Sequence, residues 1–258
     1  MALVSYATSA AFATITLDSP DTRNAISEAL LAELLSALRR AGADETVRAV
    51  VLTHSGNTFC AGGALSVRDG ENRSPAEISA DTTRKLVELL RAMLELPKPI
   101  VARVDGHVRA GGMGIVAACD LAVAGPDSTF ALTEAKLGVA PAIISLVLLP
   151  KLAPRAASRY FLTGEKFGAE QAERIGVVTA AAADPAALVM TLLTEFGKAA
   201  PQGLAETKRL LTRDMLAAID AHADELARRS AALFDTDAAR EGILSFLGRR
   251  EPSWTVIP

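Results

Sequence analysis

The sequence predicts an α/β protein with a largely parallel sheet, followed by a helical C-terminal region. Short strand-like runs alternate with segments of helical apolar spacing through the first part of the chain. Parallel strands need a crossover between them, and a helix usually supplies it. From Pro154 onward the pattern is mostly helical. With 258 residues, half of them hydrophobic, the chain can bury a sizeable core.

The expected strands are short. Apolar and polar residues alternate over residues 12–17, which is typical of a half-buried strand, and residues 18–21 are expected to form a turn. Three further runs are almost wholly apolar, which predicts buried strands. These runs are residues 49–53, 100–104 and 121–124.

Two sets of apolar residues between these strands share the spacing of one helix face. The sets are Ile26, Leu30, Leu34 and Leu38, and Leu86, Leu89, Leu90, Met93 and Leu94. Further helical segments are expected over residues 169–174, 186–198, 204–216 and 221–246. The C-terminal helices are amphipathic, so we expect them to cover the core or a neighbouring subunit. The polar stretch 69–75 predicts a mobile loop beside the active site.

Composition argues against several classes of partner. The net charge is only −3 and the basic residues are scattered, so nucleic acid is not expected as a partner. No basic segment leads into an apolar signal core, and no apolar run reaches the ~18 residues of a membrane span. We therefore expect a cytoplasmic protein without a membrane partner. Cys60 and Cys119 are expected to be reduced structural thiols, and His54 and His222 lack the spacing of metal ligands.

Two glycine-rich stretches carry most of the chemical information. They are residues 57–65 (NTFCAGGAL) and residues 105–114 (DGHVRAGGMG), and each follows a β-forming run. Glycine lets backbone N–H groups turn toward a bound atom. Two such donors aimed at one point would form an oxyanion hole for a carbonyl oxygen that becomes negative during reaction.

These stretches resemble the two signatures of the enoyl-CoA hydratase/isomerase (crotonase) family. Residues 17–20 (LDSP) and 24–27 (NAIS) are similar to the family's first turn and helix start, and residues 241–254 are similar to its C-terminal end. The resemblance therefore spans nearly the whole chain. It implies a spiral of repeated ββα units, an acyl-CoA substrate and no separate cofactor, because coenzyme A is part of the substrate.

The resemblance also implies the catalytic groups. The N–H groups of Gly63 and Gly111 would bind the thioester oxygen, and Glu134 matches the second of two glutamates that family hydratases place around one water. Gly114 stands where the first glutamate is expected. Glu134 is therefore the single candidate acid/base, and in an apolar pocket its pKa would be raised.

The substrate-binding residues implied by the resemblance lie near the first turn, the first glycine stretch and a later proline. They are Thr22, Arg23, Ala25, Ala61, Gly63, Leu65, Gly111 and Pro141. Arg23 would pair with a CoA phosphate; its alternative is a solvated surface role. Ile144 and Ser145 replace a glycine pair of the family, which makes the acyl pocket bulkier. His107, Arg109 and Ser145 could position a water or a substrate carboxylate, or serve only in packing.

Three functions stay open. Hydration of a 2-enoyl-CoA comes first because the family is named for it, and isomerisation of a 3-enoyl-CoA comes second because it needs only one glutamate. The third is a CoA-binding protein without catalysis. Residues 1–195 would form the crotonase-like core, and residues 196–258 a helical region for assembly into homotrimers or hexamers.

Overall fold

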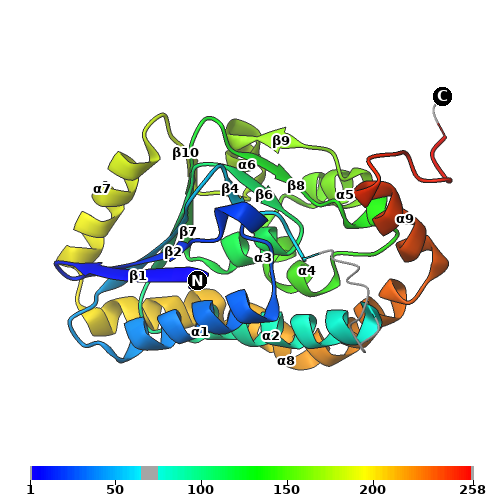
Figure 1. Cartoon of the computed structure of the whole chain (residues 1–258). Coiled ribbons are helices and arrows are strands. Elements are labelled where there is room, and N and C mark those ends of the chain that lie inside the picture. The colour runs from blue at the N-terminus through cyan, green and yellow to red at the C-terminus, as the bar shows by residue number, and fades with distance from the viewer. Residues whose placement is uncertain (1, 65–74, 257–258) are drawn as a thin grey trace.

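The computed structural model describes residues 2–64 and 75–256, and its strands form two sheets (Figure 1). The larger sheet has the order β1 (Val4–Ser9), β2 (Phe12–Leu17), β3 (Ala49–His54), β5 (Ile100–Val104), β7 (Leu121–Ala124) and β10 (Ala180–Ala181). The smaller sheet has the order β4 (Thr58–Cys60), β6 (His107–Arg109), β8 (Thr129–Ala131) and β9 (Phe167–Gly168). The buried strands predicted from the sequence are confirmed as β3, β5 and β7.

Repeated units of two strands and one helix build the molecule. In each unit the first strand joins the larger sheet and the second joins the smaller one, as β3 and β4, β5 and β6, and β7 and β8 do. The neighbouring strands from β2 to β7 and from β4 to β8 pair in parallel. The predicted spiral of ββα units is therefore confirmed. The helices are α1 (Glu28–Ala43), α2 (Pro75–Glu95), α3 (Gly111–Ala118), α4 (Ala142–Leu148), α5 (Pro154–Thr163), α6 (Ala169–Ile175), α7 (Pro185–Lys198), α8 (Pro201–Phe234) and α9 (Asp237–Leu247), with short 3₁₀ helices η1 (Pro20–Thr22), η2 (Glu134–Leu137) and η3 (Leu149–Lys151).

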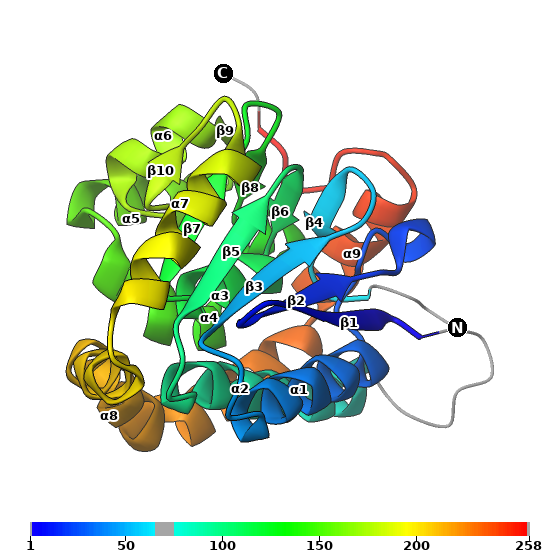
Figure 2. The same ribbon diagram turned by 90° about the vertical axis from the view of Figure 1, so that its left-hand side faces the viewer.

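The larger sheet is covered on both faces. Figure 2 shows α1, α2 and α8 along one side of it and α7 on the other. Successive strand residues point to opposite faces, so Val50 and Leu52 of β3 join the main core while Ala49 and Val51 pack in a second cluster with Val189 of α7. This is why β3 is apolar almost throughout rather than alternating.

The C-terminal helices break at a different place from the one predicted. The predicted segments 204–216 and 221–246 belong to α8 and α9, and α8 runs without interruption through residues 217–220. Those four residues include no glycine or proline, so nothing stops the helix there. The break comes instead at Asp235 and Thr236, where the Thr236 hydroxyl accepts the Ala239 N–H at 3.1 Å and caps α9.

A buried ion pair joins α8 to the larger sheet. Lys208 Nζ lies 2.8 Å from Asp120 Oδ2, and their side chains are only 4% and 14% exposed. The same carboxylate oxygen accepts the Ile100 N–H at 2.7 Å. Removing one partner of such a pair would leave a buried charge, so this contact makes α8 part of the core's structure. Neither residue stood out in the sequence.

Some expectations fall outside what the structure tests. The loop predicted over residues 69–75 lies, apart from Pro75, outside the described residues, as does Leu65. The division at residue 195 stays a prediction. In the described part of the chain, every helix is too short or too polar to cross a membrane.

Candidate active site

The first glycine stretch is joined to the chain just before α1. Ile26 forms an isolated parallel bridge with Gly63. The Ile26 N–H donates to Gly62 O at 2.7 Å, and the Ala64 N–H donates to Ile26 O at 3.0 Å. Because both bonds use the neighbours of Gly63, the N–H and C=O of Gly63 itself point away from Ile26. A Cβ on Gly63 would meet nothing within 4 Å, and Gly63 is exposed.

Asn24 holds the turn before Ile26 against the same stretch. Its side chain is fully buried, donates to Thr58 O at 2.7 Å and accepts the Ser19 N–H at 2.7 Å. The Ala61 N–H donates to Arg23 O at 3.1 Å. Asn24 adopts a left-handed conformation with φ of 51°, which asparagine tolerates better than most residues. This residue therefore positions the turn, although it appeared in the sequence analysis only as part of the stretch 24–27.

The second glycine stretch contains the start of α3 at Gly111. The preceding Ala110 has φ of 47° and ψ of −122°, a conformation that favours glycine. Its N–H donates to Ala131 O at 3.1 Å and its C=O accepts the Met113 N–H at 2.8 Å. Within a trans peptide the C=O and N–H are opposed, so the Gly111 N–H points away from the helix. The first N–H groups of a helix have no intrahelical acceptor and lie at the positive end of its dipole.

The two stretches touch each other through glycines. A Cβ on Gly62 would stand 3.0 Å from the Cβ of Ala110, and a Cβ on Gly112 would stand 2.6 Å from the Cβ of Cys60. Real Cβ atoms do not approach to 2.6 Å, which requires glycine at position 112, and Gly62 has a φ of 91°, which favours glycine there. Gly63 and Gly111 are the next residues in the chain after the two that form this contact, Gly62 and Ala110.

Ile26 contacts both candidate donors. Its backbone forms the bridge with Gly63, while its Cδ1 lies 2.6 Å from where a Cβ on Gly111 would be. The helical spacing predicted Ile26 as the first residue of a helix face, and this was wrong. The Ser27 hydroxyl accepts the Leu30 N–H at 3.2 Å and caps α1, so Ile26 stays outside the helix.

Glu134 is the first residue of η2, three positions after Ala131, whose C=O binds Ala110. Its side chain is buried, with 9% exposure, and its Oε2 has no hydrogen-bond partner among the described residues. Burial raises the pKa of the Glu134 carboxyl to about 7, opposed in part by a hydrogen bond from its own backbone N–H. Its burial excludes a solvated surface role for this carboxyl. A carboxyl with this pKa can both take up and release a proton near neutral pH.

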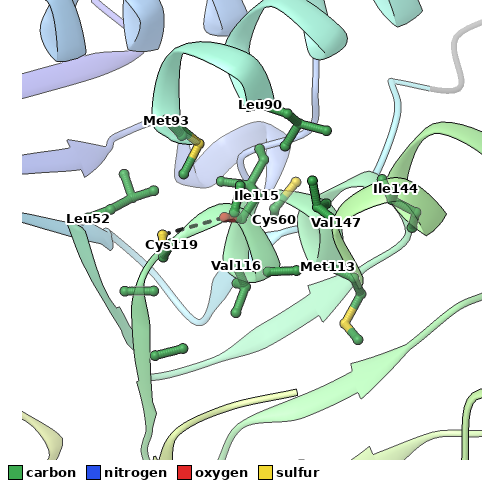
Figure 3. Packing of buried hydrophobic residues seen from close by; sticks show 14 of the residues in the cluster. Leu52, Cys60, Leu90, Met93, Met113, Ile115, Val116, Cys119, Ile144 and Val147 are labelled. Carbon is green, nitrogen blue, oxygen red and sulfur yellow. Dashed lines mark hydrogen bonds between the residues drawn. The ribbon is translucent and has the colours of Figure 1, made fainter. Parts of the chain in front are cut away.

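The position of the missing glutamate is occupied by a neighbouring helix. A Cβ on Gly114 would overlap Cγ2 of Ile144 and come within 2.9 Å of its Cβ. Ile144 belongs to α4, which begins after Pro141, and Figure 3 shows it in the apolar cluster with Val147 and Met113. The chain therefore fills this space with an aliphatic side chain.

The other polar candidates have partners within the fold. Arg109 donates to Thr129 O at 2.7 Å and to its Oγ1 at 2.8 Å, and that Oγ1 lies 2.9 Å from His107 Nδ1. The Ser145 hydroxyl donates to Ala142 O at 2.5 Å. These contacts favour the packing alternative for all three residues.

The other histidines and the two cysteines differ in their surroundings. His54 Nε2 accepts the Asp105 N–H at 3.0 Å, whereas His222 is exposed on α8. Cys60 and Cys119 are buried free thiols, and burial raises the pKa of each to about 12. Over residues 2–64 and 75–256, no cluster of three or more His, Cys, Asp or Glu side chains is arranged to hold a metal ion.

Four of the residues predicted to bind the substrate lie on the two segments joined by Asn24. Thr22 and Arg23 are exposed, while Ala25 and Ala61 are half-buried. The hydroxyl of Thr22 is bonded to Ser19. No ion pair within the described ranges engages the Arg23 guanidinium. Leu65 lies outside the described residues, and Pro141 lies apart from these segments, before α4.

Comparisons with known proteins identify the family of the whole chain. The family model described as enoyl-CoA hydratase/isomerase matches residues 7–256. The crystal structure of an enoyl-CoA hydratase from Mycobacterium avium is 52% identical, with a TM-score of 0.92, and the match covers 99% of this chain and 100% of that one. A Thermus thermophilus protein named provisionally as an enoyl-CoA hydratase is 34% identical, over 93% of this chain and 96% of its own length. The 1,2-epoxyphenylacetyl-CoA isomerase of Escherichia coli is 29% identical, over 94% of each chain. This chain belongs to the enoyl-CoA hydratase/isomerase family.

Proposed function

We propose that this chain forms an enolate from an acyl-CoA thioester, with Gly63 and Gly111 as donors to the thioester oxygen and Glu134 as the proton carrier. The observation that carries the proposal is the Glu134 carboxyl, which is buried, has an unpartnered Oε2 and has a pKa of about 7. A buried carboxyl oxygen without a hydrogen-bond partner lowers the stability of the folded protein, so its presence points to a functional role.

The two backbone donors suit the charge that this chemistry creates. Removing a proton from the α-carbon of a thioester, or adding a nucleophile to the β-carbon of its enoyl form, moves negative charge onto the carbonyl oxygen. A fixed donor aimed at that oxygen lowers the barrier by about 3 to 4 kcal/mol. The Gly111 N–H adds the positive end of the α3 dipole.

Isomerisation of a 3-enoyl-CoA to a 2-enoyl-CoA is the reaction that this geometry supports best. Glu134 would take a proton from C2, the C3–C4 double bond would move to C2–C3 through a dienolate, and the same carboxyl would return the proton to C4. One carboxyl completes the cycle, and no water is consumed. The closed position at Gly114 is consistent with this requirement.

Hydration of a 2-enoyl-CoA is the second candidate. The sequence analysis placed it first, and the names of the Mycobacterium avium and Thermus thermophilus proteins favour it. Here Glu134 would take a proton from water as its oxygen adds to C3, and then protonate C2. The carboxyl would have to hold the water without a second acid.

Substrate binding would use the exposed turn beside the first glycine stretch. Arg23 lies there without an ion-pair partner in the described structure, and a guanidinium binds phosphate oxygens well. Because Asn24 fixes this turn to the segment of Ala61 and Gly63, a CoA held at Arg23 would enter the site from that side.

Assays of crotonyl-CoA and of a 3-enoyl-CoA, run side by side on the same preparation, test the proposal. Turnover of the 3-enoyl-CoA as the faster reaction supports isomerisation, and faster hydration of crotonyl-CoA supports the second candidate. Binding of acyl-CoA without turnover of either substrate would identify a non-catalytic CoA-binding protein.

We also propose that the chain assembles into trimers or hexamers. Leu210 and Leu211 on α8 are 73% and 70% exposed, and Phe246 on α9 is 55% exposed. Large apolar side chains gathered on terminal helices are typical of subunit interfaces. Light scattering at micromolar concentration tests this, because a monomer would contradict it.

A further inference from the structure

We propose that Ile144 determines which reaction the site performs, because it fills the space that an acid at position 114 would need. The inference rests on the proposed function and names the residue that decides between its two candidates. Gly114 lies three positions after Gly111 in α3, so a side chain there would stand on the same helix face as Gly111.

The contact leaves no room for any side chain at position 114. Besides the overlap with Cγ2 of Ile144, a Cβ there would lie 2.9 Å from the Cβ of Ile144 but 3.5 Å from its Cα. A distance of 2.9 Å is too short for two Cβ atoms, whereas 3.5 Å is an ordinary contact. Truncation of Ile144 to alanine is therefore insufficient, and only glycine would admit a side chain at position 114.

The same contact excludes an ordered water from this side. Ile144 is 2% exposed and belongs to the apolar cluster that includes Met113, Ile115 and Val147 (Figure 3). A buried water needs two to four polar partners, and apolar surroundings stay dry. The only polar side chain that the proposed mechanism uses is Glu134, whose Oε2 is free.

The two sides of the site therefore differ in the chemistry they permit. Glu134 moves a proton between two carbons of the substrate, which needs no further group. Holding a water for attack on C3 needs acceptors on the other side, and Ile144 occupies that place. Gly114 and Ile144 together favour isomerisation over hydration, because they exclude both an acid and an ordered water from this side of the site.

The test is to reopen the position and restore the acid. The double variant Gly114→Glu with Ile144→Gly is compared with each single variant and with the wild type on crotonyl-CoA and a 3-enoyl-CoA. We expect the ratio of hydration to isomerisation to rise by ~100-fold or more in the double variant, the range that a positioned acid or base contributes. Gly114→Glu alone should lower the melting temperature, since its side chain overlaps Ile144.

Ile143 supplies a matched control. It is also buried on α4, with 6% exposure, but the three atoms nearest to a Cβ at position 114 all belong to Ile144. Gly114→Glu with Ile143→Gly should keep the low melting temperature of Gly114→Glu and gain no hydration. Truncating either buried isoleucine to glycine destabilises the core, so the Gly114→Glu, Ile144→Gly variant should melt at a higher temperature than the Gly114→Glu, Ile143→Gly variant, which is a readout independent of turnover.

The outcomes separate the inference from the proposed function. If Glu134→Gln leaves wild-type turnover intact, the proposed function is wrong. If turnover depends on Glu134 but the reaction ratio is unchanged in a stable Gly114→Glu, Ile144→Gly variant, the inference alone is overturned. It is also overturned if Gly114→Glu folds and hydrates equally well with Ile144 present, or if the wild type hydrates faster than it isomerises.

Discussion

The two halves of the candidate site are held in place by different means. The donor half, Gly63 and Gly111, is placed by backbone hydrogen bonds and by contacts at Gly62 and Gly112 that admit no Cβ without displacement. The carboxyl half, Glu134, sits on one turn of 3₁₀ helix with one oxygen unpartnered. The donor half is therefore sensitive to any change in backbone or volume, whereas the carboxyl half should tolerate a change of chemistry that keeps its shape.

The largest effect is expected at the carboxyl half. Glu134→Gln is nearly isosteric, so the fold and acyl-CoA binding should be preserved, while turnover should fall by ~100 to 10000-fold because the proton carrier is lost. Steady-state kinetics on both substrates and calorimetry with an unreactive acyl-CoA measure the two properties. Wild-type turnover in this variant would refute the assignment of Glu134.

The next effect concerns the donor half. Gly111→Pro removes one N–H and should lower kcat/KM by ~100-fold or more. Gly111→Ala is the control, because it keeps the N–H but meets the same contact with Cδ1 of Ile26, 2.6 Å from the new Cβ. If the two folded variants lose the same activity, the packing and not the donor is responsible.

The pH dependence sharpens the contrast, since only the carboxyl half titrates. With a Glu134 pKa of about 7, kcat/KM should rise with pH to a plateau, with a midpoint near 7 and a tenfold loss per unit well below it. The folded-state pKa is raised above its usual value, so the folded protein binds this proton more tightly, and the stability contribution of Glu134 is lost as pH rises from about 4.5 to 7.

The stability of Glu134→Gln relative to wild type should therefore increase over this range by about 3 kcal/mol, at about 1.4 kcal/mol per pKa unit. Denaturant unfolding at pH 5 and pH 8 measures it. A constant difference between the two proteins would contradict the raised pKa.

The smallest expected effect distinguishes the two donors from each other. A Cβ on Gly63 meets nothing within 4 Å, so Gly63→Ala should change the free energy of unfolding by less than ~1 kcal/mol. Gly111→Ala must displace Ile26 and should cost ~1 to 3 kcal/mol. Equal effects in urea unfolding would show that the two glycines are packed alike.

The sequence by itself determined the fold class and the main chemical elements of the candidate site. Apolar runs such as 100–104 predicted buried strands because period and burial are local properties. The glycine stretches predicted backbone N–H donors after β-forming runs, and the resemblance they carry singled out Gly63, Gly111 and Glu134. The assigned roles of these three residues stay predictions.

Only the tertiary structure decided how these elements meet. Ile26 and Gly111 are far apart in the chain, and their contact depends on the bridge to Gly63, which no local pattern encodes. The break between α8 and α9 was misplaced because helix propensity is a weak signal beside capping and packing. Gly114 appeared in the sequence as a missing acid, and the structure adds that Ile144 occupies its space. A sequence gives the volume of each side chain, but which volumes compete for one place depends on the packing of helices from separate ββα units.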